Sequence, residues 1–479
     1  MSLESVLAVN RFGLGARPGE VERAAADPKA WLAAQLAPAP QPVDADGQPF
    51  VSGAQRVADL TAFRQARRQV RAQDDAKQAQ EFARRQRQVL MDEMAARFQL
   101  GFTTDRPFAE RLVWFWTNHF TISTQNAGTA SLAGAYEREA IRPFIAGKFE
   151  DMLLAVATHP AMLVYLNNAQ SIGPGSMAGA RSNRGLNENF GRELMELYSL
   201  GVDGGYTQAD VIALAKLLTG WSLDAGPAAN ARQVRPFGGR LVQTVFEGEA
   251  PQGTSRGFRF YPNRHEPGSI RLRGKTYPGG YEGGRAAIHD LAQDPATARF
   301  VAGKFAVHFI SDNPPPASVA ALEKSFRDSG GDLKALALTA VHDPAAWKPE
   351  PGKMRPPVEF VTAAYRLLGL PKGAGAARQV QAAMQACRIM GQFPMAAPSP
   401  KGWSDQSQDW SGPDAVLSRI AFARQMAERL ASASIPVMTL ADAALGPRLT
   451  QATRSAVAGA ENSADGLALL LASPEFQRR

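Results

Sequence analysis

Apolar residues recur with helical spacing along most of this 479-residue chain, and this period limits the fold more than any other feature of the sequence. Alternation of the β type is confined to one Gly-, Pro- and Arg-rich region, residues 225–285, where "GFRFYPNRHEPGSIRLRGKTYPGG" reads as a hairpin. The sequence therefore predicts a mainly α protein, a multi-helix globular body with a small β-hairpin insertion.

Changes in composition divide the chain into five expected segments. The second of these segments is polar and rich in Arg and Gln, and it lacks Pro and Gly until its end. This composition is typical of a solvent-facing long helix or helical pair. The segments are an N-terminal helical segment 1–54, the helical arm 55–101, core helices with a candidate site 102–224, the hairpin insertion 225–285 and a C-terminal helical region 286–479.

Charge and cysteine content narrow the possible partners and compartments. The net charge of +8 is small for this length, and no basic run is interleaved with aromatic residues, so nucleic-acid binding is not favoured. A single cysteine, Cys387, excludes an intrachain disulfide. The sequence as given begins without a signal peptide and has no apolar run near the ~20 residues of a membrane span. We expect a protein without a transmembrane segment, either cytoplasmic or exported with a partner.

One carboxylate falls where an apolar residue is expected. On a helical wheel from Leu186 to Gly201, Glu193 lies inside the stripe formed by Leu186, Phe190, Leu194, Leu197 and Leu200, with Asn189 and Glu196 beside it. A charge in that place needs a partner. Three interpretations stay open: a buried salt bridge to an arginine, a general acid/base or metal ligand completed by Glu196 and Asn189, or a frayed helix on which Glu193 reaches water.

Two further groups could join Glu193. His119 lies on an apolar face of "RPFAERLVWFWTNHF", where a satisfied core histidine is the ordinary interpretation. In the hairpin, His265 and Glu266 are adjacent and could both reach one site from a turn. A histidine together with carboxylates is a ligand set that divalent metals favour. We find no HExxH, CxxC, P-loop, GxSxG or GxGxxG pattern that carries an argument.

Several longer blocks resemble a bacterial protein family. In order along the chain they are "RFGLGARP", "WFWTNHF", "YEREAIRPFIAGKFEDMLLAVATHPAMLVYLNN", "LNENFGRELMELYSLGVDGGYTQADV", "FYPNRHEPG", "FVAGKFAVHFISDNPP", "MRPPVEFV" and "MGQFPMAAPSPKGW". Over nearly its whole length the chain is similar to the uncharacterised family catalogued as domain of unknown function 1800. The resemblance implies no assigned activity. It implies a frequent genomic neighbour, an exported sulfatase-like family catalogued as domain of unknown function 1501, as a possible partner. Tyr198 and Glu266 stand where the family commonly has His and Asp.

These observations support two main functional hypotheses. In the first, the protein is an enzyme whose catalytic residues are Glu193, Glu196 and His119, with a divalent metal held by Glu193, His119, His265 and Glu266. In the second, it is a non-catalytic binding or assembly protein, which contacts the sulfatase-like partner through the Arg-rich arm and the loop of Trp403 and Trp410. A carbohydrate-surface protein is a third, weaker interpretation of that aromatic loop.

Overall fold

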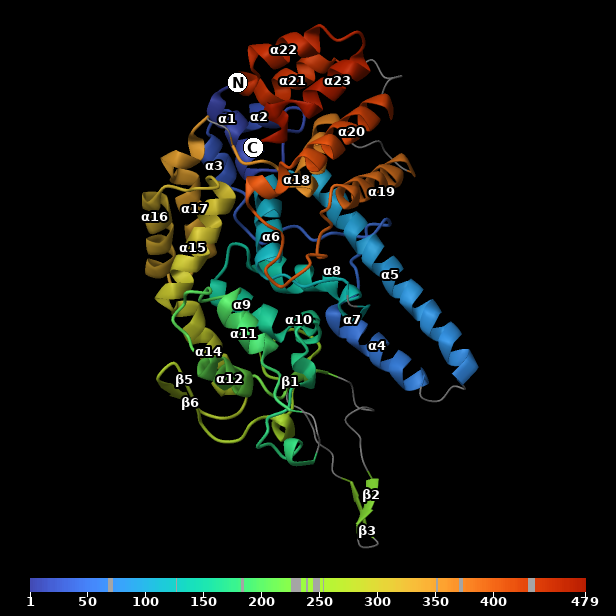
Figure 1. Cartoon of the computed structure of the whole chain (residues 1–479), viewed down its shortest axis with the longest axis vertical. Coiled ribbons are helices and arrows are strands. Elements are labelled where there is room, and N and C mark those ends of the chain that lie inside the picture. Colours follow the sequence, from blue (N-terminus) through green and yellow to red (C-terminus); the bar gives the residue numbers. More distant parts are fainter. Residues whose placement is uncertain are drawn as a thin grey trace.

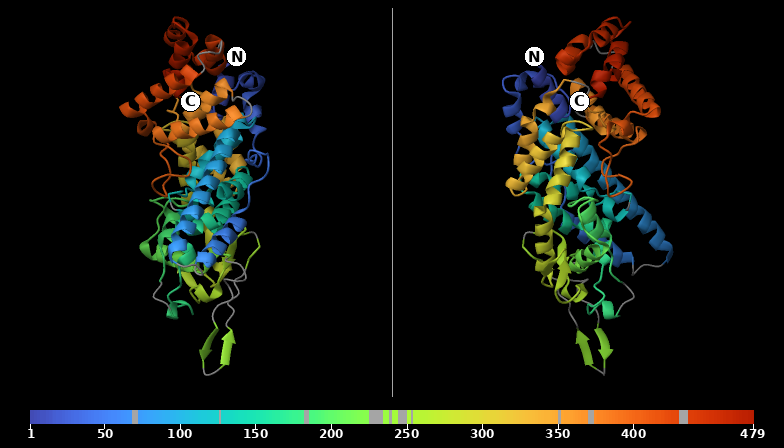
Figure 2. Two further views of the ribbon diagram at one scale, coloured as in Figure 1. Left: turned by 90° about the vertical axis from the view of Figure 1, so that its right-hand side faces the viewer. Right: turned by 60° about the vertical axis from the view of Figure 1, so that its left-hand side comes forward.

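The computed structural model confirms a mainly α protein with small β elements. It describes residues 1–67, 72–125, 127–181, 185–224, 234–237, 240–243, 250–252, 254–349, 352–369, 374–429 and 436–479. The molecule is elongated, with the C-terminal helices at one end and the strands β2 and β3 at the other (Figure 1). Figure 2 shows the same long body from two further sides.

The N-terminal half supplies the centre of the body and the arm at its side. Its α-helices are α1 (Leu3–Leu7), α2 (Glu20–Ala24), α3 (Pro28–Ala33), α4 (Gly53–Arg67), α5 (Ala72–Thr103), α6 (Pro107–His119), α7 (Ala127–Ala130), α8 (Ala133–Tyr136), α9 (Phe149–Thr158), α10 (Pro160–Tyr165), α11 (Asn189–Glu196) and α12 (Gln208–Leu217). Two π-helical turns, η1 (Ala8–Phe12) and η2 (Glu137–Ile141), accompany them. The predicted arm is the helix pair α4 and α5, which leans away from the body (Figure 1).

In Figure 1 the C-terminal half lies on both sides of α6 and forms the upper end of the molecule. Its α-helices are α14 (Tyr281–Gln293), α15 (Pro295–Phe309), α16 (Pro316–Asp328), α17 (Leu333–His342), α18 (Pro357–Leu368), α19 (Ala374–Ile389), α20 (Pro413–Arg429), α21 (Val437–Leu445), α22 (Gln451–Ala458), α23 (Ser463–Ala472) and α24 (Pro474–Gln477). Short 3₁₀ turns connect several elements: η3 (Arg142–Phe144), η4 (Asn168–Gln170), η5 (Gly179–Arg181), η6 (Pro262–Arg264), η7 (Pro344–Trp347), η8 (Ser407–Trp410) and η9 (Gly446–Arg448).

The strands that the structure describes form three antiparallel pairs. β5 (Ile270–Leu272) and β6 (Lys275–Tyr277) make the predicted hairpin, with Arg273 and Gly274 in left-handed conformations at its turn. β4 (Phe258–Phe260), which the sequence assigned to the same hairpin, instead pairs with β1 (Trp221–Leu223) at the end of the core segment. β2 (Val234–Phe237) pairs with β3 (Arg240–Gln243). The rest of the insertion between 225 and 253 lies largely outside the described residues.

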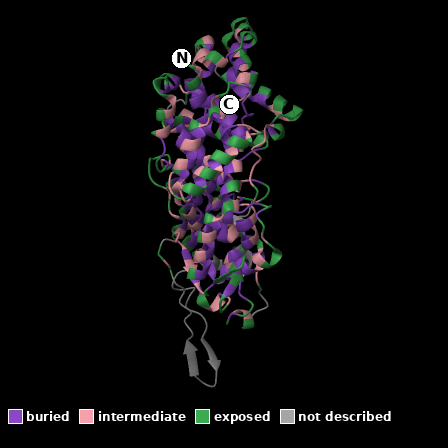
Figure 3. Ribbon diagram, turned by 90° about the vertical axis from the view of Figure 1, so that its left-hand side faces the viewer, coloured by how far each residue is buried: buried purple, intermediate pink, exposed green. Residues whose placement is uncertain are grey.

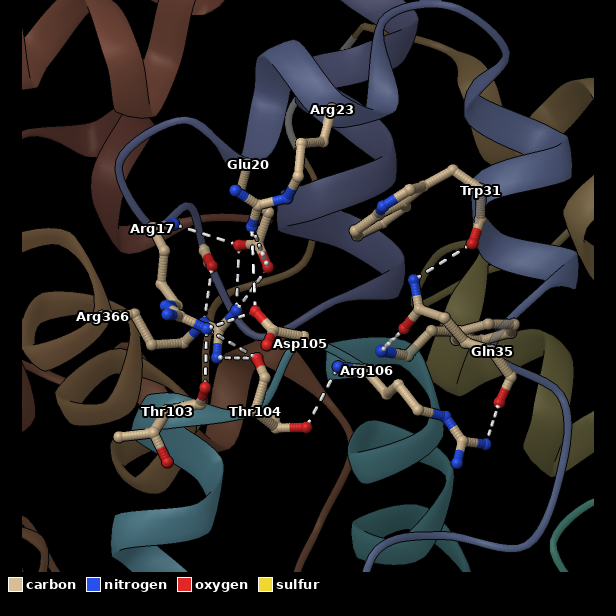
Figure 4. A network of polar contacts seen from close by, with 12 residues as sticks. Arg17, Glu20, Arg23, Trp31, Gln35, Thr103, Thr104, Asp105, Arg106 and Arg366 are labelled. Carbon is tan, nitrogen blue, oxygen red and sulfur yellow. Dashed lines mark hydrogen bonds and ion pairs between the residues drawn. The ribbon is translucent and has the colours of Figure 1, made fainter.

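Buried residues extend through the long axis of the body (Figure 3), and their apolar side chains form one large core cluster. Some charges are nevertheless buried in pairs. Arg366 of α18 donates two hydrogen bonds to the carboxylate of Glu20, at 2.8 and 2.9 Å, and both side chains are fully buried. Figure 4 shows how this pair and Arg17 join the N-terminal segment to the end of α5. Such pairs favour the packing in which both segments are in contact, because separating them would leave an unpaired charge buried in the core.

A second buried network holds the start of α6 to the turn η2. The Arg142 guanidinium donates to both oxygens of Glu110, each at 2.7 Å, and to Glu137 at 2.6 Å, and all three side chains are buried. Arg97 of α5 reaches the other oxygen of Glu137 at 2.6 Å. These four residues therefore connect α5, α6 and the consecutive turns η2 and η3 through buried ion pairs.

Candidate functional site

Glu193 lies at the edge of its helix's buried face and not within it. α11 spans Asn189–Glu196, shorter than the predicted helix from Leu186 to Gly201. Its buried residues are Phe190, Gly191, Leu194 and Met195. A Cβ at Gly191 would lie 2.9 Å from the backbone of Ala215, so this glycine face packs against α12 and turns Glu193 toward the solvent boundary.

Glu193 and Glu196 are half-buried neighbours on that edge. Burial and the adjacent Glu196 carboxylate raise the pKa of Glu193. Tyr206 donates a long hydrogen bond to Glu196 at 3.5 Å. Within the part of the chain that the structure describes, Glu193 forms no ion pair, so the first of the three interpretations, a buried salt bridge to an arginine, is not seen there, and the side chain is partly exposed.

His119 is enclosed by aromatic rings. Phe115, Trp116, Phe120, Phe149 and Phe300 surround the imidazole, and its Nε2 lies 3.2 Å from the Tyr198 carbonyl. Burial lowers the pKa of His119 well below its usual range, so the ring is neutral. This is the environment of a core histidine, the ordinary interpretation of the sequence pattern.

His265 and Glu266 tie the insertion to the body. The His265 Nδ1 lies 2.9 Å from the Thr219 carbonyl, and its Nε2 accepts from the Gly280 amide at 2.8 Å. Glu266 accepts from the Gly175 amide at 2.7 Å and pairs with Lys216 at 3.3 Å. Among the described residues, no three His, Cys, Asp or Glu side chains are arranged to hold a metal ion. The structure therefore does not bring Glu193, His119, His265 and Glu266 together as one coordination sphere.

A different pair of side chains faces a cavity. The cavity has a volume of about 80 Å³ and lies between α6, α15, α18 and the loop of residues 391–406, which we call the pocket loop. Its walls combine aromatic and polar residues: Arg97, Trp114, Phe115, Thr117, Asn118, Thr121, His308, Pro356, Val358, Glu359, Gln392, Pro394, Met395, Ala397, Trp403, Ser404 and Asp405. This space admits one small group of a ligand, since whole-ligand sites usually measure ~300–1,000 Å³.

His308 and Asp405 form a hydrogen-bonded pair in the wall of this cavity. The His308 Nδ1 lies 2.8 Å from Asp405 Oδ1, which places the proton on Nδ1 and leaves Nε2 as an acceptor. His308 is 5% exposed, and its Nε2 is a buried atom for which the described residues provide no hydrogen-bond partner. Burial lowers the pKa of His308 to about 4, so the imidazole is neutral at pH 7.

Surrounding charges hold the pair in place. Burial alone raises the pKa of the Asp405 carboxyl, but His308 and Lys353 outweigh it and keep the pKa well below its usual range. Lys353 also donates to the backbone carbonyls of Val307 and Asp405, which fastens the end of α15 to the pocket loop. Below the imidazole, Glu359 accepts from Arg111 at 2.7 Å and pairs with Arg479 at 2.9 Å.

Asn118 and Gly402 shape the pocket loop. The Asn118 side chain donates to the Trp403 carbonyl at 2.9 Å and accepts from the Trp403 amide at 2.8 Å. Gly402 has a φ of +84°, and a Cβ there would lie 2.5 Å from the Asn118 carbonyl oxygen. Met395, which also lines the cavity, is held at a φ of +54°. Strained backbone of this kind concentrates at functional sites.

Gly402→Ala is therefore expected to destabilise the protein by about 1–3 kcal/mol, because the new methyl group forces the loop away from α6. Urea denaturation measures the change. Gly391→Ala is the matched control, since Gly391 lies in the pocket loop with the same φ of +84° and a Cβ there meets open space. Equal stability of the two variants would show that the close approach at Gly402 does not shape the loop.

The sequence interpretation missed His308 and Asp405, although a signal was present. On α15, His308 continues the buried positions Val301 and Phe305 at helical spacing, the same pattern that singled out Glu193. Asp405 lies in an irregular loop, where no period identifies a buried carboxylate.

Comparison with known proteins supplies a family and no chemistry. The model of the family described as "Protein of unknown function (DUF1800)" matches residues 7–478. No curated protein matches the chain. No solved structure matches it either. In the segments that the structure describes, no helix is both long and apolar enough to cross a bilayer.

Proposed function

Because this chain belongs to the family described as "Protein of unknown function (DUF1800)", for which no chemistry is assigned, we propose a function from the site itself: the protein is an enzyme in which His308, oriented by Asp405, acts as a general base. The observation that carries the proposal is that His308 lines the cavity and that its buried Nε2 has no hydrogen-bond partner in the described chain.

The chemistry of the pair fits a hydrolytic reaction. A neutral imidazole removes a proton from water or a hydroxyl group through Nε2, and the Asp405 carboxylate on Nδ1 stabilises the imidazolium that forms. The cavity of about 80 Å³ holds a water molecule together with one small reacting group. We infer that a substrate inserts its scissile ester-like or phosphoester-like end, while the rest of it lies outside along Trp403 and the pocket loop.

The sharpest test replaces His308 alone. His308→Gln removes the base but keeps a polar side chain of similar size, and general-base catalysis is typically worth 10²- to 10⁴-fold. Hydrolysis of p-nitrophenyl acetate, p-nitrophenyl butyrate, p-nitrophenyl phosphate and bis-p-nitrophenyl phosphate is measured for wild type and variant. We expect at least one probe to be hydrolysed by wild type and at least 100-fold more slowly by the variant.

His289→Gln is the control, because His289 is about half exposed and its Nδ1 pairs with the partly exposed Glu150. Thermal denaturation of both variants separates lost chemistry from lost folding. A wild-type rate no higher than that of His308→Gln across all four probes contradicts the proposal.

Glu193 and Glu196 are a second candidate pair for proton transfer. Burial and the neighbouring carboxylate raise the pKa of Glu193, which favours a role as a proton donor. Glu193→Gln in the same four assays tests this pair separately from His308. We rank the pair lower, because neither carboxylate orients a histidine or lines the described cavity.

A non-catalytic assembly role has its own supporting observation. Val416, Leu417 and Ile420 lie on one face of α20 and are 38%, 64% and 39% exposed. Exposed apolar side chains grouped in this way favour a protein partner, for which the family's sulfatase-like genomic neighbour is the candidate. If the protein has only an assembly role, His308→Gln is expected to change its stability but not the rate at which any of the four probes is hydrolysed.

A further inference from the structure

A second, larger cavity lies among the C-terminal helices. It is an open groove of about 810 Å³ between the start of α1, the turn η9 and the helices α22, α23 and α24. This volume lies within the ~300–1,000 Å³ usual for small-molecule sites. The groove shares no lining residue with the cavity of His308.

The groove wall is aliphatic. It is formed largely by the side chains of Leu3, Pro447, Ala452, Ala456, Leu469 and Ala472, and none of the described lining residues is aromatic. Leu469 is 44% exposed, a large apolar area to leave in water. Sugars and nucleobases are held largely by stacking on aromatic rings, so this wall fits a flexible alkyl chain better than a ring.

The acidic residue in the groove is already satisfied. Glu475 accepts from the Thr450 amide at 3.1 Å and from the Thr453 hydroxyl at 3.0 and 2.9 Å. These hydrogen bonds direct the carboxylate toward the protein. Burial raises the pKa of Glu475, but the hydrogen bonds from Thr450 and Thr453 outweigh burial and lower it. Glu475 is therefore ionised, and its carboxylate oxygens already accept hydrogen bonds from the protein.

The cation beside it is only partly satisfied, because the charge of Glu475 interacts with the Arg448 guanidinium but does not give every nitrogen a hydrogen bond. Arg448 lines the groove, and its Nη1 is a buried nitrogen without a hydrogen-bond partner among the described residues. Its charge adds to those of Arg11 and Arg355 nearby, whose pKa values burial and the Arg448 guanidinium both lower. An anion in the groove offsets this accumulation of positive charge and gives Arg448 an acceptor.

We propose that the groove binds a linear aliphatic carboxylate, with the alkyl chain along the Ala- and Leu-lined wall and the carboxylate on Arg448. A guanidinium pairs with a carboxylate through two parallel hydrogen bonds. This pairing fixes the position of the ligand's carboxylate end, while the alkyl chain makes only apolar contacts. The inference is independent of the proposed hydrolytic site, because His308 takes no part in it.

Isothermal titration calorimetry with sodium decanoate and with 1-decanol tests the two halves of the site. Wild type is expected to bind decanoate saturably at one site. Arg448→Gln is expected to weaken decanoate binding at least 10-fold and 1-decanol binding less than 2-fold, because the alcohol has no charge to lose. Arg454→Gln, which changes a partly exposed cation on α22, is the matched control.

Filling the groove is expected to act on both ligands. Ala456→Trp places an indole in the alkyl channel from an exposed helical position and should weaken decanoate and 1-decanol alike by at least 10-fold. Ala458→Trp, exposed on the same helix outside the groove, is the control. Dodecanoate is expected to bind roughly 10-fold more tightly than decanoate, from two further buried methylenes. The proposal is overturned if decanoate does not saturate wild type, or if each variant binds it as its control does.

Discussion

Arg142→Met is expected to destabilise the protein by about 3–5 kcal/mol, a large share of the ~5–15 kcal/mol that stabilises a typical domain. Methionine keeps a long unbranched side chain but removes all five hydrogen bonds of the guanidinium, including both to Glu110. Glu110 then stays buried, and the Trp114 indole is the donor that remains to it among the described residues. The large effect comes from that stranded carboxylate, since an unpaired buried charge costs more than a lost pair.

The urea midpoint of wild type, Arg142→Met and Arg192→Met measures this effect. Arg192 pairs with Glu188 on the outside of α11, where both side chains are about one-third exposed, so the same substitution there is expected to change stability by less than about 1 kcal/mol. Adding Glu110→Gln to Arg142→Met is expected to recover part of the loss, because the amide still accepts from Trp114 and carries no charge. Equal midpoints for Arg142→Met and Arg192→Met would refute the buried network's role.

The free energy of unfolding is expected to decrease in two pH ranges as the pH is lowered, and particular side chains set each range. Burial lowers the pKa of His308 from 6.5 to about 4, so the unfolded chain gains a proton at this residue before the folded one does. The stabilisation from His308 is complete above pH 6.5 and is lost as the pH falls to about 4, which amounts to about 3 kcal/mol.

Buried carboxyl groups whose pKa is lowered, among them Glu137, Glu359 and Asp405, set the second range. Burial opposes their ionisation, but Arg97 and Arg142 lower the pKa of Glu137 to about 2, and Arg111 and Arg479 do the same for Glu359. Each contributes stability that is complete above pH 4.5 and is lost as the pH falls toward 2, again about 3 kcal/mol apiece. Stability therefore decreases from pH 6.5 downward and more steeply below 4.5.

Urea denaturation at steps from pH 7.5 to pH 3.5 measures the slope. His308→Gln is expected to flatten the curve between pH 6.5 and 4.5, since glutamine does not titrate. His289→Gln, at an exposed position, should keep the wild-type slope throughout. A wild-type slope above pH 4.5 that persists in His308→Gln would show that the burial of a neutral His308 is not the cause.

Several features of the fold could be predicted from local sequence. Thr207 and Asp210 form the capping box that their spacing indicates, with both reciprocal hydrogen bonds present. The hairpin at residues 270–277 follows from alternation around Arg273 and Gly274. Each of these depends on residues a few positions apart, whose geometry the chain itself determines.

The position of Glu193 shows where this reasoning stops. A helical wheel gives the angle between side chains, but it does not give the angle between the helix and its neighbours. Close packing of Gly191 against α12 rotated α11 so that the glutamate met solvent. The same limit explains why His119, His265 and Glu266 do not share one site: they contact different backbone groups, those of Tyr198, Thr219 and Gly175.

The amino-acid sequence by itself determined that this chain is mainly helical, where its small hairpin lies and to which family it belongs. Only the tertiary structure decided which buried polar groups meet: His308 with Asp405 across 97 residues, and Arg366 with Glu20 across 346. The physical reason is that helix and hairpin formation depend on short-range geometry, whereas the cost of an unpaired buried charge is relieved by whichever partner the packing brings near.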